Sequence, residues 1–88
     1  MKSDDFRKLT TFRQVEMLFE KGQHVLSRIY LFYNVHLYTL AGFYAEIWYR
    51  QADNKIERVV ILDQADVLDL YDNQIGLSDI IGSIEPKE

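Results

Sequence analysis

The chain has 88 residues, a formal net charge of −4 and no cysteine. The lack of cysteine excludes disulfides and thiolate metal sites, and the acidic balance, without any run of three basic residues, argues against nucleic-acid and membrane-surface binding. Hydrophobic residues make up 48% of the chain, including one Trp, six Tyr and five Phe, so the composition indicates a folded domain rather than a disordered segment.

The N-terminal stretch has no apolar segment after its lysine, so it does not look like a signal peptide. No apolar run approaches the roughly 20 residues that span a bilayer. We therefore expect a cytoplasmic protein made of a single α+β domain over residues 1–88, with a frayed tail over residues 83–88 around Pro86.

The first predicted element is a helix over residues 10–22. Its apolar residues recur at three- and four-residue spacings, which forms a stripe for the core: Phe12, Val15, Leu18 and Phe19. Thr11 followed by Gln14 fits a capping box, and Gly22 is placed for a left-handed residue just past the helix end. An earlier turn can begin at Ser3 and carry Phe6.

After Gly22 the hydrophobic period changes from helical to two. Four segments rich in β-branched and aromatic residues follow, over residues 23–29, 33–40, 43–51 and 55–62. The connections between them are three to five residues long, which is too short for parallel crossovers. The pattern therefore predicts an antiparallel β-meander.

The register of the second hairpin depends on its turn. A three-residue loop over residues 40–42 would place a left-handed Gly42 last and sort apolar pairs onto one face, such as Val35 with Ile47. A two-residue loop would instead pair Leu37 with Glu46 and mix the faces. We expect the three-residue loop.

The register of the third hairpin can also be predicted. Pairing Ile47 with Val59 keeps the apolar face apolar and sets Arg58 opposite Trp48. A tight turn at residues 53–54 is the competing interpretation, and it would reverse the parity of the fourth strand.

The last predicted element is a helix that begins after a capping Asp63 and ends at Asn73 or Gly76, with a further short turn over residues 77–82. The resulting order is α-β-β-β-β-α, an α+β fold in which the helices cover one face of the sheet. The expected core packs the stripe of the first helix on six strand residues: Val35, Leu37, Ala45, Ile47, Val59 and Ile61.

Three motifs resemble a group of short bacterial proteins that carry no assigned activity. They are a helix ending in Glu-Lys-Gly, the aromatic strand FYAEIWY, and the hairpin segment NKIE, and the match covers roughly residues 16–72. Ile47 stands where such proteins often have valine. The resemblance implies a fold and supplies no site residues.

The expected outer face of the sheet carries the candidate chemistry. In the favoured register His36, Glu46 and Arg58 form a row that Arg28 extends. A histidine beside a carboxylate can act as an acid–base pair, but charged cross-strand pairs are ordinary on a solvated sheet, and a flat sheet offers no cleft. We therefore assign no catalytic residue and expect no enzyme.

The same face favours protein association, because Tyr, Trp and Arg are enriched at interface centres. We expect a non-enzymatic interaction module that forms a homodimer, with no nucleic-acid or membrane partner. The predicted interface residues are His36, Tyr38, Tyr44, Glu46, Trp48, Arg50 and Arg58. The alternative is a small-molecule binding protein or enzyme that uses this face as a pocket wall.

Metal and cofactor sites are not expected. His24 has no histidine or carboxylate at ligand spacing, and the aspartates at three-residue intervals from Asp63 lack the glycine and closing glutamate of a calcium loop. The four glycines are isolated, so there is no phosphate-binding loop.

Overall fold

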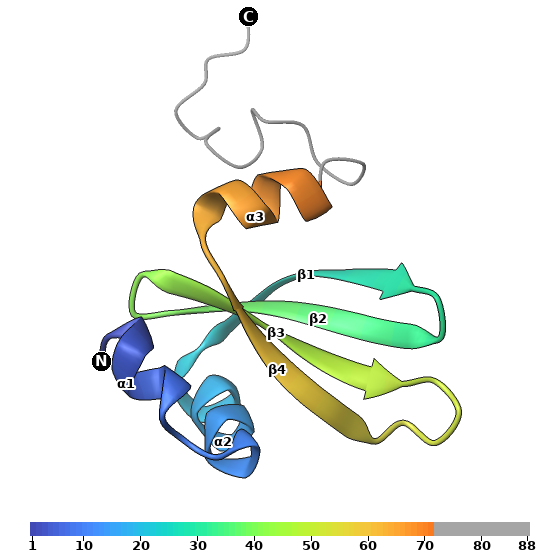
Figure 1. The fold of residues 1–88 in the computed structure, drawn as a ribbon, viewed down its shortest axis with the longest axis horizontal. Coiled ribbons are helices and arrows are strands. Elements are labelled where there is room, and N and C mark those ends of the chain that lie inside the picture. Colours follow the sequence, from blue (N-terminus) through green and yellow to red (C-terminus); the bar gives the residue numbers. More distant parts are fainter. Residues whose placement is uncertain (72–88) are drawn as a thin grey trace, which may run out of the picture.

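The computed structural model describes residues 1–71 and contains one four-stranded antiparallel sheet in the order β1-β2-β3-β4 (Figure 1). The strands are β1 (Gln23–Tyr30), β2 (Tyr33–Leu40), β3 (Phe43–Arg50) and β4 (Ile56–Leu62). The helices are α1 (Ser3–Arg7), α2 (Thr11–Lys21) and α3 (Gln64–Leu70). The predicted α+β meander is confirmed, and the early turn at Ser3 is the separate helix α1.

The two ends of α2 differ from the sequence prediction. The N-cap is Thr10, whose hydroxyl accepts from the Arg13 amide at 3.2 Å, rather than Thr11. Gly22 is extended, with φ of −86°, so the predicted left-handed conformation is wrong. A glycine is nevertheless required, because a Cβ there would lie 2.8 Å from the carbonyl oxygen of Leu18.

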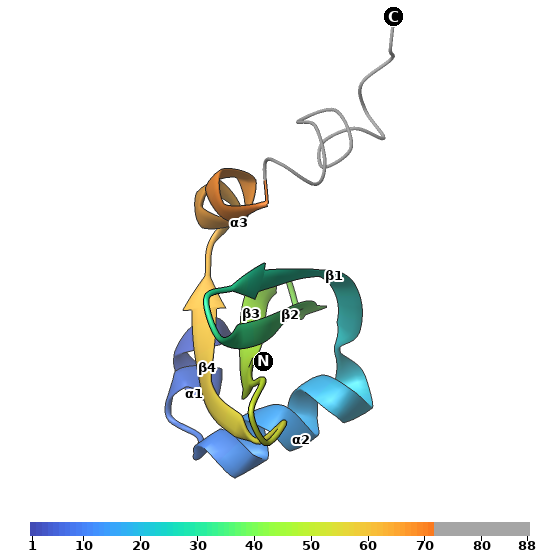
Figure 2. The same ribbon diagram turned by 90° about the vertical axis from the view of Figure 1, so that its right-hand side faces the viewer.

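The helices lie on both faces of the sheet, not on one as predicted. Helices α1 and α2 pack on one face and α3 crosses the other, as the two perpendicular views show (Figures 1 and 2). We call these the α2 face and the α3 face. The connection from β4 into α3 is short, so the chain crosses to the second face immediately after Leu62.

Each face has its own core. Leu18 and Phe6, both fully buried, pack on the α2 face with Leu40, Ala45 and Ile47. The core of the α3 face joins residues of the sheet and of α3: Leu37, Leu62, Val67 and Tyr71.

The predicted core is therefore only partly correct. Leu18 is buried as expected, but Phe12 and Phe19 are 72% and 55% exposed. Val35 and Leu37 are buried on the α3 face, where α2 does not reach them.

The register of the second hairpin is the two-residue alternative, and the three-residue loop is wrong. Val35 pairs with Trp48 and Leu37 pairs with Glu46 across β2 and β3. The turn residues Ala41 and Gly42 have φ values of 49° and 89°, which is the twist that two-residue hairpins prefer. Apolar residues do not sort onto one face here because each face of the sheet carries a core of its own.

Other predictions are confirmed. Ile47 pairs with Val59, and Trp48 pairs with Arg58, across β3 and β4. Asp63 caps α3 in a capping box with Asp66. Helix α3 ends at Leu70, while Asn73, Gly76, the turn over residues 77–82 and the tail over residues 83–88 lie outside the described residues.

Candidate functional site

The observed register separates the predicted interface residues onto two faces. His36 pairs with Ile47 and points with Tyr38 to the α2 face, whereas Glu46 belongs to the α3 face. The predicted row of His36, Glu46 and Arg58 therefore does not form. The remaining members lie with Glu46 on the α3 face: Tyr44, Trp48, Arg50 and Arg58.

Glu46 is the centre of the α3 face. Only 1% of its surface is exposed, yet its carboxylate accepts hydrogen bonds from three residues. Arg28 donates from Nε at 3.0 Å and from Nη2 at 3.3 Å. Trp48 donates from Nε1 at 3.1 Å, and the Tyr71 hydroxyl donates at 2.6 Å. The buried charge is thus paired and fully hydrogen-bonded, which is the condition under which a protein interior tolerates a carboxylate.

Arg28 completes this cluster. Its guanidinium carbon lies 5.4 Å from the ring centroid of Trp48, 5.5 Å from Tyr71 and 5.7 Å from Tyr30. Burial opposes its charge, but the hydrogen bonds and charge of Glu46 outweigh that effect and raise the pKa of Arg28. The same two influences, burial first and then the Glu46 carboxylate, raise the pKa of Tyr71. Arg28 and Tyr71 are therefore both held in their protonated forms.

Burial also limits what a partner can touch. Glu46 and Trp48, the latter 6% exposed, are buried and make their contacts within the chain. Arg50 and Arg58 remain exposed, and Arg50 pairs with Asp53 at 3.0 Å. Within the predicted interface on this face, direct contact is thus left to the arginines and the half-buried Tyr44.

A hollow of about 440 Å³ opens beside the Glu46 cluster. We call it the Trp48 hollow; its lining residues are Arg28, Tyr30, Glu46, Trp48, Arg58, Val60, Leu62 and Leu70. The Arg58 guanidinium stacks over the Trp48 ring at 4.2 Å from its centroid. The hollow therefore combines apolar walls with one exposed cation.

The α2 face carries a second polar group that sequence reasoning missed. Ser27 Oγ lies 2.7 Å from His36 Nδ1 and 2.9 Å from His24 Nε2. An irregularity in β1 between His24 and Leu26 brings the two imidazoles to 5.5 Å between ring centroids. Burial, and then the nearby His24, lower the pKa of His36. A bulge cannot be read from alternation of residue types, so the sequence left His24 without a partner.

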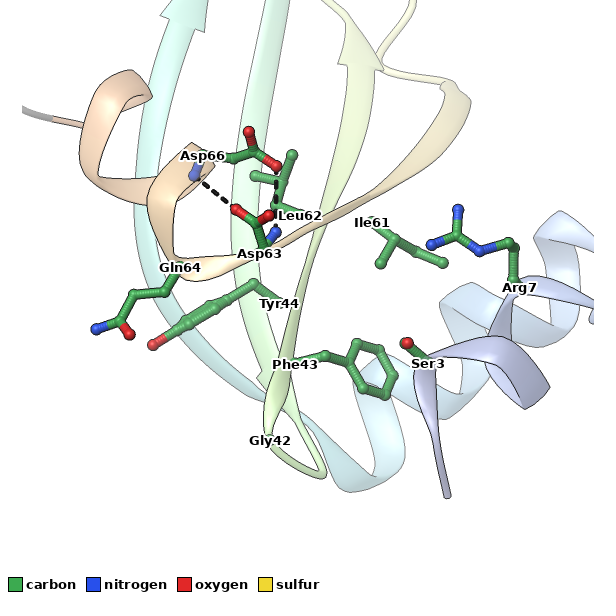
Figure 3. A pocket seen from close by; sticks show the side chains of 10 residues that line it. All are labelled: Ser3, Arg7, Gly42, Phe43, Tyr44, Ile61, Leu62, Asp63, Gln64 and Asp66. Atoms are coloured by element: carbon green, nitrogen blue, oxygen red, sulfur yellow. Dashed lines mark hydrogen bonds between the residues drawn. The ribbon is translucent and has the colours of Figure 1, made fainter.

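A second hollow, of about 430 Å³, lies between α1, the end of β4 and the start of α3 (Figure 3). Phe43 and Ile61 form its apolar wall, and Arg7 stands across from Asp63. The Asp63 and Asp66 carboxylates are already engaged in the capping box, as the dashed lines show. Apart from Arg7, the charged side chains that line this hollow are therefore already hydrogen-bonded.

The most unusual surface is the turn between β1 and β2. The two turn residues and the last two residues of β1 are exposed although they are large and apolar: Ile29 by 73%, Tyr30 by 47%, Leu31 by 68% and Phe32 by 78%. We call these four residues the apolar tip. Its sequence signal was the stretch RIYLFY, which joins two strands without any of the usual turn residues.

Over residues 1–71 no group of three or more histidine, aspartate or glutamate side chains is arranged to hold a metal ion. No helix in this part of the chain is both long and apolar enough to cross a bilayer.

The fold and the site together define a small α+β meander protein with a buried Arg–Glu pair and an exposed apolar hairpin tip. No protein-family model, curated protein or solved structure matches the chain. The resemblance to short bacterial proteins stays a prediction.

Proposed function

We propose that the protein is a small non-enzymatic interaction module that self-associates through the apolar tip. The observation that carries this proposal is the exposure of Phe32 and Leu31, at 78% and 68%, in a two-residue turn. Turns between strands are usually built from small or polar residues, because these suit both water and tight backbone angles. Large exposed apolar patches mark interaction sites.

The backbone of the turn supports the same conclusion. Leu31 has a φ of 51°, a left-handed conformation that costs a bulky residue about 1–2 kcal/mol. Glycine or asparagine would adopt it at lower cost. A strained leucine at a solvated turn is thus better explained by what its side chain contacts in an assembly than by the needs of the isolated fold.

The turn is also held in place. The Gln51 amide donates to the Phe32 carbonyl at 2.9 Å, which joins the β1–β2 turn to the loop after β3. Both loops lie at the end of the sheet away from α1 (Figure 1). A fixed, projecting apolar tip loses little conformational entropy when it binds.

A second copy of this chain is the partner that the exposed area supports. From the sizes of its side chains, the tip exposes roughly 500 Å² of mostly apolar surface, near the upper end of what monomers leave uncovered. Two such tips together reach the total of about 1,000 Å² at which specific interfaces begin. The predicted homodimer is thus retained, with its contact moved from the sheet face to the tip.

Sedimentation velocity and light scattering from micromolar to millimolar concentration test this proposal. We expect a wild-type dimer and a monomeric Phe32→Glu variant. The matched control is Phe12→Glu, which adds the same charge at a phenylalanine of similar exposure on α2 and should leave the dimer intact. A wild type that stays monomeric at every concentration, or a Phe32→Glu variant as dimeric as the wild type, would reject the proposal. Thermal melts establish that both variants are folded.

A further inference from the structure

The Trp48 hollow and the apolar tip adjoin on the chain, but the turn residues of the tip do not line the hollow. Tyr30 belongs to both, since it is the last residue of β1 and also lines the hollow. The turn residues Leu31 and Phe32 continue past it and are left exposed. Within residues 1–71 no segment fills the hollow, so we look for its occupant in a second copy of the chain.

We infer that the Trp48 hollow is the receptor for the apolar tip of a second copy, so that each tip of a two-fold dimer enters the hollow of its partner. This inference rests on the proposed self-association and names the surface that receives the tip.

The chemistry of the hollow matches the tip. Its walls include Val60, Leu62 and the 42% exposed Leu70, which offer apolar contact. The tip and the two residues after it, 29–34, carry no acidic or basic side chain, so the tip brings no charge that the hollow would have to neutralise. The charge of Glu46 is already matched by Arg28 at 3.0 Å.

Arg58 adds a specific attraction. Its guanidinium covers one side of the Trp48 ring, and Arg58 as a residue is exposed. An arginine between two aromatic rings gains a second cation–π contact. The tip supplies such a ring in the exposed Phe32, so Trp48, Arg58 and the Phe32 ring of the second copy can stack in succession.

Two-fold symmetry follows from the positions of the two surfaces. Because tip and hollow share an edge at Tyr30, a partner that places its tip in the hollow brings its own hollow close to the first tip. Such a contact is isologous and closes after two copies. It also adds the walls of both hollows to the area of the tips, which takes the interface beyond the minimum of about 1,000 Å².

The absence of cysteine from the sequence allows a direct test. Leu31→Cys places a thiol in the tip and keeps Phe32, and Leu70→Cys places one at the rim of the hollow. The two variants, one carrying a mass tag, are mixed at equal concentration and oxidised mildly, and the disulfide-linked dimers are counted by mass. The same mixture oxidised in denaturant gives the random distribution.

We expect the crossed Leu31→Cys/Leu70→Cys product to rise from its random share of about one half towards all of the linked dimer, and both same-site products to fall several-fold below their random shares. A matched mixture of Leu31→Cys with Gln64→Cys, at the start of the same helix but outside the Trp48 hollow, should stay near random. Excess of the tip-to-tip product would overturn the inference and leave the proposed self-association standing.

The remaining outcomes also decide between the two proposals. A random distribution from a protein that sediments as a dimer would show that the dimer contact lies elsewhere and would overturn the inference. A random distribution from a monomeric wild type would overturn both proposals and assign the tip to a different partner, such as another protein or a small apolar ligand.

Discussion

The Tyr71 hydroxyl donates a 2.6 Å hydrogen bond to Oε2 of Glu46, and this bond ties the end of α3 to the middle of β3. Both groups are buried, with 0% and 1% of their surfaces exposed. Arg28 approaches the same carboxylate from β1, so one side chain links a helix to two strands. The α3 face is therefore organised around a charge rather than around an apolar centre alone.

Removing that charge should be costly. Glu46→Gln leaves the Arg28 guanidinium, 13% exposed, without its counter-ion, and we expect a loss of about 3–5 kcal/mol in the free energy of unfolding, as for other broken buried pairs. Urea denaturation measures it. The control Glu20→Gln, at an exposed position of α2, should change stability by less than about 0.5 kcal/mol. Equal midpoints for both variants would mean that the pair contributes nothing.

Tyr71→Phe tests the contribution of the Tyr71 hydroxyl to stability. The ring still packs against Leu37 and Val67, so the change removes only one hydrogen bond to a charged acceptor. We expect a loss of about 1.5–3 kcal/mol. Denaturant titration followed by Trp48 fluorescence would report it, since the indole bonds the same carboxylate. An unchanged midpoint would show that α3 does not depend on this bond.

The docking of α2 depends on Leu18. Leu18→Ala should destabilise the protein by about 2–5 kcal/mol, because the residue is fully buried against the α2 face. Phe12→Ala removes a larger side chain from the same helix, but Phe12 is 72% exposed, so its effect should be much smaller. Equal losses in guanidinium denaturation would contradict this assignment of the helix face.

Substitutions at the two residues of the Ala41–Gly42 turn should change stability in opposite directions. Gly42→Val should cost about 1–2 kcal/mol, because its φ of 89° is strained for any side chain even though the space around it is open. Ala41→Asn should raise the melting temperature, since Asn-Gly is the preferred pair when both residues have positive φ. Thermal melts of both variants check the turn; a destabilised Ala41→Asn would argue against the two-residue register.

The histidine pair predicts a pH effect of defined sign. The pKa of folded His36 is lowered by burial and then by His24, so below the unfolded value of about 6.5 the unfolded chain takes up more protons. Stability from this group is thus fully present above about pH 6.5 and is lost as the pH falls through the folded pKa. NMR titration of the imidazole protons measures that pKa.

His24→Gln separates the two causes of this shift. The variant removes the neighbouring charge but keeps the burial, so the pKa of His36 should move part of the way back towards its usual value. A pKa of His36 at or above 6.5 in the wild type would refute the assignment.

The sequence by itself determined the elements and their order. Helical spacing located α2, two-residue alternation located all four strands, short connections made the sheet an antiparallel meander, and Asp63 marked the start of α3. It also favoured the pairing of Ile47 with Val59 over a tight turn at residues 53–54, and the structure has that pairing. These features depend on local periodicity and capping, in which each signal lies within a few residues of the structure it specifies.

Only the tertiary structure decided which side chains share a face. The pattern rule that apolar residues gather on one face assumes that the other face is solvated, and here α3 covers part of it. Leu37 can therefore stand opposite Glu46, because Tyr71, 25 residues further along the chain, and Arg28 satisfy the carboxylate. A charge looks like a surface residue in the sequence, and only partners brought together by folding make its burial favourable.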